Sequence, residues 1–414
     1  GLGDVYKRQA CKSCSIMSGF GGAGAFSDGK YNITNDFGGT LYEYLGKAKA
    51  LELMRYVDQI NMAYGGEGTK LYSTAGTKFK KLCMQNDLHL LDASVRHLGT
   101  DINYVVLENL YAYLKEKVTF YFDTPVESVA AVDGGYQVTC KAGSFSCSQC
   151  VISVGRSGSK WMESVCRDMD IPTKSNRVDI GVRVEVRDEV MEFLNKNLYE
   201  AKLVYYTPTF DDKVRTFCTN PSGEVATEYY ENGLAVVNGH AYKSQEFKTN
   251  NTNFALLVSK NFTKPFKTPI EYGKQIAQLS NMLCDGKILV QTYGDFKRGR
   301  RTTEERLCRN NLIPTLKDAV PGDLSLVFPH RIMVDIAEMI EALDKVTPGI
   351  ASDETLLYGV EVKFYSNKVV VDKDFCTSVK GLRAIGDGAS VTRGLQQASA
   401  NGLSVARSIL KSMK

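Results

Sequence analysis

The chain has 414 residues, 43% of them hydrophobic, and is long enough for two domains with separate cores. Its formal net charge of +4 favours neither a nucleic-acid partner nor a membrane surface. No apolar run reaches the length of a membrane span, no secretory signal pattern is found, and eleven cysteines in a chain of this size are typical of a reducing compartment, so we expect a cytoplasmic protein.

Residues 1–9 carry neither an initiator methionine nor apolar periodicity, which is typical of an adapter sequence, and we expect the natural chain to begin near Ala10. Cys11 and Cys14 then form a C-x-x-C pair. A redox pair, half of a zinc site and two reduced thiols all fit this spacing. Since no second pair stands at metal spacing, two reduced thiols are favoured and no metal site is expected.

A glycine-rich segment follows at residues 19–30 and contains five glycines. So many glycines do not suit the interior of a helix or strand. We therefore predict a loop whose backbone lies against a ligand, with Lys30 adding a positive charge. The segment is neither a Walker A motif nor a G-x-G-x-x-G turn between a strand and a helix. A surface loop without a ligand is the alternative.

Apolar periodicity predicts helices first and antiparallel strands after them. In chain order we expect a helix at 42–59, a strand at 88–93, a polar turn at 96–101, a helix at 103–115, and strands at 118–122, 125–129 and 136–140. The last strands form a β-meander. His97 stands alone before a helix, so we interpret it as a structural group rather than a catalytic one.

The meander leads into a strand at 150–154 that ends at Gly155 and Arg156, with helix-forming residues at 161–169. A boundary is expected at 171–174, because the composition changes there. The block from about 176 to 350 is predicted to be a mixed α+β domain. Its expected elements are strands at 178–186, 203–207, 213–218, 234–237 and 254–258 and a helix at 271–283.

One dense basic run, residues 297–301, lies in this middle block and is followed at once by Glu304 and Glu305. The adjacent carboxylates favour a solvated face or a local anion site over a nucleic-acid groove. The polar side chains singled out for chemistry in the block are Arg300, Arg301, His330 and Arg331.

The end of the chain carries the strongest local pattern. A hairpin is expected at 356–364 and 368–371, then a buried strand at 382–385, glycines at Gly386 and Gly388 around Asp387, and a helix from about Gly394. The free amides of a helix start attract phosphate, and a carboxylate in a glycine turn suits a sugar hydroxyl. The pattern predicts a nucleotide-cofactor pocket, and an ordinary turn between a strand and a helix is the alternative.

The order of these elements resembles that of two-dinucleotide-binding-domain flavoproteins. Longer segments resemble a family of uncharacterised bacterial FAD-dependent dehydrogenases, from Cys11 onward. They are CSIMSGFGGAGAFSDGK, RHLGTD, VDIGVRVEV, KLVYYTPTFDDKVRTFC, NTNFALLVSK, DETLLYGVEVKFYS and IGDGASVTRGLQQASANG.

The resemblance implies an α/β fold: a Rossmann-like FAD-binding domain in residues 10–175 and 351–414, with an inserted mixed α+β substrate domain in residues 176–350. Such flavoproteins open with a strand, a G-x-G-x-x-G turn and a helix. That first βαβ unit is missing before Cys11, so we expect a chain truncated at its N-terminus.

The resemblance also implies a set of cofactor contacts. Asp387 would hold the ribityl or pyrophosphate part of FAD, Val126 would touch the adenine, and Gly394, Leu395 and Gln396 would lie near the flavin. The remaining cofactor-binding positions are Gly21, Gly22, Gly24, Asp28, Lys30, Gly155, Arg156, Gly386 and Gly388.

The function implied is a dehydrogenase that passes a hydride from a small-molecule substrate to FAD, with NAD(P)H as a candidate electron donor. As a hypothesis, Arg393 would stabilise the reduced ring, while Arg300, Arg301 and His330 would hold an anionic substrate, and Cys11 and Cys14 would shuttle electrons. The alternatives are an RNA-modifying flavoprotein, in which residues 297–301 would track phosphates, and a non-catalytic fragment that no longer holds FAD. The sequence specifies neither the substrate nor the oligomeric state.

Overall fold

The structure is a computed structural model. It describes residues 19–25, 27, 29–74, 77–198, 201–230, 233–241, 245–263, 265–266, 268–365 and 367–413. The chain folds into two compact units. The first combines Gly1–Ser73, Asp92–Ser175 and Ser366–Lys414, and the second combines Thr74–Leu91 and Asn176–Tyr365. Cys11, Cys14 and Asp28 lie outside the described residues.

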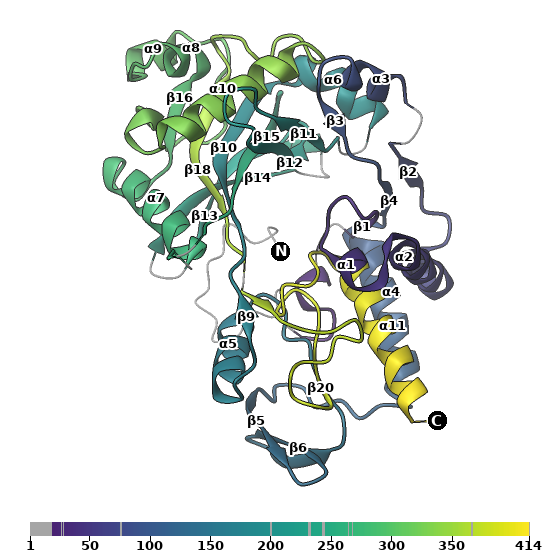
Figure 1. The fold of residues 1–414 in the computed structure, drawn as a ribbon. Coiled ribbons are helices and arrows are strands. Elements are labelled where there is room, and N and C mark those ends of the chain that lie inside the picture. Colours follow the sequence, from purple (N-terminus) through teal and green to yellow (C-terminus); the bar gives the residue numbers. More distant parts are fainter. Residues whose placement is uncertain are drawn as a thin grey trace. The chain divides into compact units, whose positions relative to one another are not determined.

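The first unit contains short strands and several helices (Figure 1). Its strands are β1 (Lys30–Ile33), β2 (Leu71–Ser73), β4 (Ser94–His97), β5 (Val126–Val132), β6 (Gly135–Cys140), β7 (Gly143–Cys147), β8 (Cys150–Ile152), β9 (Thr173–Lys174), β19 (Lys368–Val369) and β20 (Leu382–Ala384). Its helices are η1 (Gly22–Gly24), α1 (Leu41–Leu45), α2 (Lys47–Asn61), η2 (Met62–Gly66), α4 (Gly99–Leu114), α5 (Ser159–Asp168) and α11 (Leu395–Ser412).

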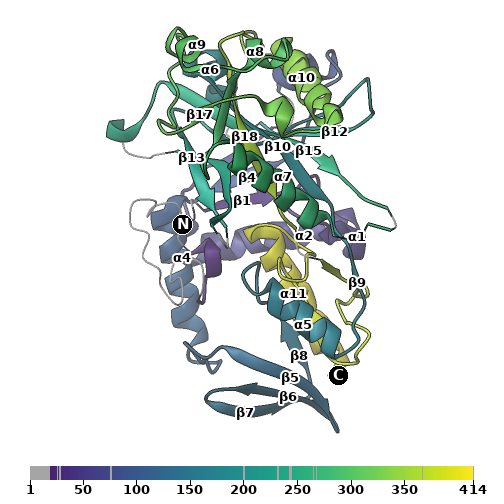
Figure 2. The ribbon, with the colours of Figure 1, turned by 90° about the vertical axis from the view of Figure 1, so that its left-hand side faces the viewer.

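Four small sheets make up the strands of this unit, in the orders β1-β4-β2, β5-β6-β7, β20-β8 and β19-β9. The strands expected at 125–129 and 136–140 are confirmed as β5 and β6, which form the antiparallel sheet β5-β6-β7 together with β7 (Figure 2). Helix α2 packs its buried face, including Leu53, Met54 and Val57, with residues of β8, β20 and α11 in one apolar core. This core holds the two strands that lead to the candidate cofactor site.

The second unit is built on one sheet of eight strands in the order β17-β16-β18-β10-β15-β12-β11-β3. The strands are β3 (His89–Leu90), β10 (Val178–Arg187), β11 (Leu203–Tyr206), β12 (Lys213–Asn220), β15 (Asn251–Lys260), β16 (Leu289–Thr292), β17 (Val320–Pro321) and β18 (Leu356–Lys363), with a separate hairpin of β13 (Glu224–Tyr229) and β14 (Ala235–His240). The helices are α3 (Lys78–Met84), α6 (Asp188–Asn197), η4 (Gln245–Phe247), α7 (Pro269–Leu283), α8 (Tyr293–Lys297), α9 (Glu304–Cys308), η5 (Leu324–Leu326) and α10 (His330–Asp344).

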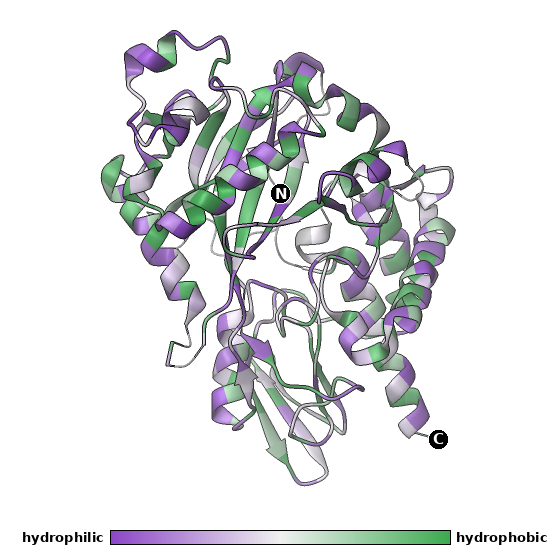
Figure 3. Ribbon diagram, turned by 45° about the horizontal axis from the view of Figure 1, so that its top comes forward, coloured by the Kyte–Doolittle hydropathy of each residue, from purple (hydrophilic) through white to green (hydrophobic). Residues whose placement is uncertain are grey.

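Strand alternation gives this sheet an apolar face. On β10, Ile180, Val182 and Val184 join the core formed with α6, α7 and α10, while the residues between them point to the opposite face. Figure 3 shows the matching pattern on the helices, where hydrophobic and hydrophilic residues alternate along each ribbon. The opposite face of the sheet carries charged residues.

Several expected elements differ from the structure. The helix expected at 42–59 is divided at Gly46, whose φ of +79° ends α1 before α2 begins. Residues 118–122 form no strand, because their aromatic rings pack with Phe20 and Tyr111 instead of pairing along a backbone. The polar turn expected at 96–101 forms the end of β4 and the start of α4.

The hairpin expected at 356–371 is also wrong. Strand β18 pairs with β10 and β16 in the second unit, and β19 pairs with β9 in the first. Residues 351–365 therefore belong to the second unit rather than to a C-terminal part of the first. Residues 74–91 join the second unit too, because β3 pairs with β11. Among the described residues, no helix combines the length and the apolar character needed to cross a membrane.

Candidate functional site

Two glycine turns meet beyond the ends of the parallel strands β8 and β20. The strands pair Leu382 with Cys150 and Ala384 with Ile152, and the turns that follow them touch. A Cβ atom placed on Gly388 would lie 2.6 Å from the carbonyl oxygen of Gly155, so only glycine permits this approach. Ligands of α/β sheets bind beyond the carboxyl ends of parallel strands, and this is the position of both turns.

Asp387 links the second turn to the start of α11. The Thr392 hydroxyl donates to Asp387 Oδ1 at 2.8 Å, and the Gly394 amide donates to Asp387 Oδ2 at 3.3 Å. Burial raises the pKa of Asp387, although these two hydrogen bonds and the positive charges of Arg156 and Arg393 oppose the rise. The carboxylate therefore holds the segment from Gly386 to Gly394 in a fixed loop.

The backbone around this loop is open on one side. Gly155, Gly386 and Gly394 have φ values of +66°, +72° and +98°, and a Cβ atom on any of them would meet nothing within 4 Å. Gly394 also stands at the N-cap of α11, where no side chain caps the first amides. Helix amides and open glycine backbone together suit a phosphate-containing ligand such as the pyrophosphate of FAD. The residues present therefore fit the predicted cofactor.

The early glycine loop reaches the same helix start. A Cβ atom on Gly24 would lie 2.2 Å from Leu395 Cδ2, so η1 packs directly on the first residue of α11. Asn103, fully buried, fixes the loop by donating to the carbonyl oxygens of Gly24 at 2.7 Å and Ala25 at 3.1 Å. Tyr31 in turn donates to Asn103 at 2.7 Å. The structure thus brings together Gly24, Leu395 and Gly394, three of the positions predicted to bind the cofactor, and Gly22 beside them has open space at its Cβ position.

Other predicted cofactor residues lie elsewhere in the first unit. The Gln396 side chain is buried and its amide donates to the carbonyl oxygen of Met54, so only its backbone faces the helix start. Val126 begins β5 and is 39% exposed. Lys30 begins β1, where it pairs with His97, and Gly21 packs against Leu107. Their cofactor contacts stay predictions.

Sequence reasoning missed a second glycine pair that supports the site. The Arg393 amide donates to the carbonyl oxygen of Gly38 at 2.8 Å, and Gly39 forms an isolated bridge with Thr392. A Cβ atom on Gly39 would lie 2.7 Å from Thr392 Cα. The sequence feature that could have indicated this contact is the pair of adjacent glycines, Gly38 and Gly39, shortly before a helix. Asn401, which accepts the Gly386 amide at 2.9 Å, carried no local signal because it lies mid-helix.

The three residues predicted to be catalytic belong to different units. Arg393 is half-buried in the loop that begins α11, whereas Arg300 and His330 lie in the second unit. His330 is the first residue of α10 and is exposed. Arg300 pairs with Asp295, which is 3% exposed.

A cavity of about 210 Å³ lies around Arg300. It is lined by Thr292, Gly294, Asp295, Arg298, Arg300, Arg306, Arg309, Asn310, Asp353 and Glu354. Arg298 pairs with Asp353 at 2.7 Å, so carboxylates already neutralise much of the basic run. This pairing argues against a groove that tracks nucleic-acid phosphates.

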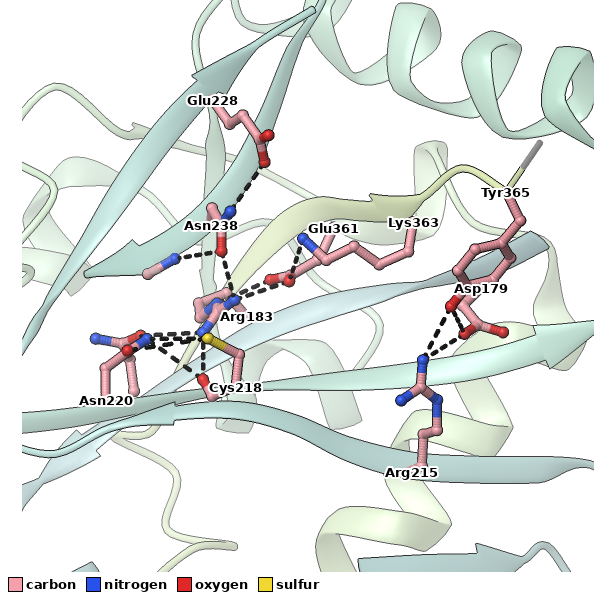
Figure 4. Close-up of polar contacts among 12 residues, drawn as sticks. Asp179, Arg183, Arg215, Cys218, Asn220, Glu228, Asn238, Glu361, Lys363 and Tyr365 are labelled. Carbon is pink, nitrogen blue, oxygen red and sulfur yellow. Dashed lines mark hydrogen bonds and ion pairs between the residues drawn. The ribbon is translucent and has the colours of Figure 1, made fainter. Parts of the chain in front are cut away.

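A network of buried charges lies on the polar face of the second unit's sheet (Figure 4). Arg183 Nε and Nη2 each donate to Glu361 at 2.8 Å, and both side chains have no exposed surface. Lys363 reaches the same carboxylate at 3.1 Å, and Asn238 accepts from Arg183 Nη2 at 3.1 Å. The sequence pattern marked β10 as a strand but did not indicate this pairing with β18.

A second carboxylate on this face is equally well paired. Arg215 donates to Asp179 at 2.6 Å, and Tyr365 donates to it as well (Figure 4). Burial opposes ionisation of Asp179, but Arg215 and Arg177 outweigh it and lower its pKa to about 2. Asp179 is therefore ionised throughout the physiological range.

Comparison with known proteins connects the second unit to flavoproteins. Residues 177–364 match the family model described as "FAD-dependent protein, C-terminal domain-like". An uncharacterized protein of Clostridium beijerinckii is 26% identical over 425 residues, which cover 96% of this chain and 70% of that protein.

Solved structures with low overall similarity include a glycine oxidase from Geobacillus kaustophilus, with 11% identity, a TM-score of 0.32, and coverage of 89% of this chain and 80% of that one. CtdE in complex with FAD has 9% identity, a TM-score of 0.27, and coverage of 92% and 73%. Tetracycline destructase Tet(51) has 10% identity, a TM-score of 0.29, and coverage of 88% and 80%. Over residues 177–364, the chain is thus similar to the C-terminal domain of FAD-dependent proteins.

Proposed function

We propose that this protein is an FAD-dependent oxidoreductase, a dehydrogenase that accepts a hydride from a small-molecule substrate. The observation that carries the proposal is the meeting of the Gly155 and Gly388 turns beside the uncapped start of α11, with Asp387 fixing the loop between them. The family match of residues 177–364 supports the choice of FAD among nucleotide cofactors.

In this proposal the protein binds and orients the cofactor, and bound FAD supplies the redox chemistry. The amides of Leu395 and Gln396 face the pyrophosphate or the flavin, and Gly155 and Gly386 let the backbone approach the dinucleotide. Arg393, beside Asp387, provides positive charge for the reduced cofactor. Arg300 and His330 remain candidates for holding an anionic substrate, and NAD(P)H remains a candidate electron donor.

The test of cofactor binding is the visible absorption spectrum of the purified protein, before and after incubation with FAD. We expect flavin bands and a stoichiometric gain of FAD. Asp387→Ala should lose most of the bound flavin, because it releases Thr392 and the Gly394 amide. Asp374→Ala is the control, since the Asp374 carboxylate accepts from Ser408 elsewhere in the first unit. A protein that stays colourless after reconstitution contradicts the proposal and favours a non-catalytic binding module.

The test of dehydrogenase activity is anaerobic bleaching of the flavin by candidate substrates and by NADH or NADPH. Substrate-dependent bleaching with reoxidation by an added acceptor is the expected result. Arg393→Ala should slow bleaching at saturating substrate and shift the flavin potential. Unchanged rates and potential in this variant would remove the role assigned to Arg393.

A further inference from the structure

Three cations surround the ring of Phe217 on the polar face of the second unit's sheet. Lys202 Nζ lies 5.3 Å from the ring centroid, the Arg215 guanidinium carbon 4.9 Å, and Lys363 Nζ 5.9 Å. Each cation–π contact contributes modestly, and Arg215 and Lys363 are also held by Asp179 and Glu361. We call Phe217 and these three cations the Phe217 face.

The carboxylates connected to this face do not balance its cations. Through Asp179, Arg215 is connected to Arg177, and through Glu361, Lys363 is connected to Arg183. Among the described residues, the connected groups are four cations (Arg177, Arg183, Arg215 and Lys363) and three carboxylates (Asp179, Glu228 and Glu361). One positive charge remains in excess. Arg177 is 38% exposed, but Arg215 and Lys363 are each only 13% exposed, so water screens the charges of these two cations weakly.

Two buried hydrogen-bond donors on the same face have no acceptor among the described residues. Arg215 Nε is one, although Asp179 and Tyr365 engage the Nη2 atom of the same guanidinium. Asn253 Nδ2 is the other, and the Asn253 side chain is fully buried while its oxygen accepts from Arg183 and Asn220. Buried donors are nearly always paired in folded proteins, so both point to an acceptor that the described part of the chain does not supply.

Excess positive charge and unpaired donors call for the same partner, an oxyanion. Strands β12 and β15 align Arg215 with Leu257 and Phe217 with Ala255, so Arg215 and Phe217 lie on one face, whereas Asn253 aligns with Asn220 further along β15. Little of Arg215 and Lys363 is exposed, so a polyanion lying along the surface would not reach them. The group that fits is the terminal oxyanion of a small molecule.

We propose that the Phe217 face binds the carboxylate of a small organic acid, which is the substrate class of this protein. The assignment of the acid as the substrate rests on the proposed oxidoreductase function, whereas the binding of a carboxylate does not. Lys363 and Lys202 provide positive charge, and Arg215 Nε donates the directed hydrogen bond. Arginine and lysine bonds to carboxylates are among the stronger hydrogen bonds in proteins.

The experiment measures binding of acetate and benzoate by isothermal titration calorimetry and by the shift of the thermal midpoint, with potassium chloride at matched ionic strength as the blank. Inorganic phosphate is a separate arm. The variants are Lys202→Gln and the double variant Lys202→Gln/Lys363→Gln. Lys363 is replaceable because Glu361 keeps Arg183 as a partner. Lys274→Gln on α7 is the matched control, since Lys274 pairs with the exposed Glu271 of the same helix.

We expect at least one carboxylate to bind the wild type, and to bind about tenfold or more weakly to the double variant, with Lys202→Gln intermediate and Lys274→Gln unchanged. Equal midpoint shifts in all four proteins, or no heat above the chloride blank, would overturn the proposal. Phosphate binding tighter than either carboxylate would overturn the carboxylate class. If the double variant does not fold, Lys202→Gln alone must still weaken binding.

Flavin absorbance, recorded on the same samples, separates this inference from the proposed function. If the protein binds flavin but binds neither carboxylate, the inference is wrong and the oxidoreductase proposal is unaffected. Carboxylate binding by a protein that cannot be loaded with flavin supports the carboxylate site and contradicts the oxidoreductase proposal.

Discussion

The two units of this protein build their candidate sites from different materials. In the first unit the site is made of main chain: glycine turns, helix amides and one carboxylate that holds them. In the second unit it is made of side chains, with buried arginine, lysine and carboxylate groups on one face of a long sheet. A main-chain site can be read from a local glycine motif, whereas a side-chain site depends on strand pairs that are far apart in the sequence.

The difference also sets where each unit is vulnerable. The first unit should be destabilised by larger side chains in its turns, because Gly388 and Gly39 already lie against neighbouring backbone. The second unit should be destabilised by removal of a charge, because the charged partner that remains is buried and is not solvated by water. Substitutions in both units test this contrast.

Glu361→Gln is expected to be the most damaging change. It removes the only carboxylate that Arg183 contacts among the described residues and leaves two buried cations without neutralisation. Loss of one partner of a buried ion pair costs about 3–5 kcal/mol of unfolding free energy. Urea denaturation followed by circular dichroism measures it. Glu189→Gln, whose partner Arg187 is exposed, should leave stability nearly unchanged, and an equal loss in both variants would contradict the argument.

A pH test addresses Asp335 in α10, which Thr207 and Lys260 contact at 2.8 and 3.3 Å. Burial and the nearby charge of Asp212 raise the pKa of Asp335 to about 6, against the opposing contributions of Thr207 and Lys260. Protonated Asp335 therefore stabilises the fold fully below about pH 4, and that stability is lost as the pH rises through 6.

Asp335→Asn keeps the side chain neutral at every pH. Relative to the wild type, its unfolding free energy should rise by on the order of 3 kcal/mol between pH 4 and pH 7, since one pKa unit corresponds to about 1.36 kcal/mol. Denaturation curves at pH 4, 5, 6 and 7 measure the difference. Glu341→Gln on the same helix controls for the loss of one carboxylate. A constant difference across the range would rule out the raised pKa.

Gly388→Ala tests the first unit's sensitivity to added atoms. The added methyl group would meet the Gly155 oxygen at 2.6 Å and its nitrogen at 3.1 Å, and backbone cannot rotate away. Overpacking of this kind costs about 1–3 kcal/mol, and we expect flavin retention to fall with it. Gly402→Ala in α11 has open space around it and should stabilise the protein by about 0.5–1 kcal/mol. Gly388→Ala should therefore lower the thermal midpoint of unfolding, and Gly402→Ala should raise it.

Thr392→Val should be the mildest of the destabilising changes. It preserves shape and removes the hydroxyl that donates to Asp387 at 2.8 Å, which costs about 1–2 kcal/mol. Thr139→Val removes an exposed hydroxyl contact with Ser144 in the meander and should be nearly neutral. Differential scanning fluorimetry compares the thermal midpoints of the two variants. If both are neutral, Asp387 does not hold the loop through Thr392.

The sequence predicted the first unit's turns well, because each is local. Gly155, Asp387 and the start of α11 stand within a few residues of the strands they follow, and the glycines that permit close approach are visible directly. The strands β10 and β15 were also predictable from their alternation. Gly46 was overlooked as a break, since one glycine within an apolar period costs little in a helix pattern.

Pairing between distant strands could not be predicted in the same way. Arg183 and Glu361 are 178 residues apart, and β3 also pairs with a strand that is distant in the sequence, since Leu90 lies opposite Leu203. Alternation assigns a residue to one of two faces but does not name the strand beside it. The division of the chain at residue 350 and the Phe217 face both depend on this missing information.

The edge of the eight-stranded sheet has a practical consequence for anyone who wishes to isolate the second unit. Its last strand, β3, and the helix α3 before it come from residues 74–91, so a fragment that covers residues 177–364 alone would leave the edge of β11 unpaired. The core would also lose Phe79, Cys83 and Leu88. Uncovered strand edges recruit further chains, so such a fragment should aggregate during expression. A soluble version would need residues 74–91 grafted onto its N-terminus.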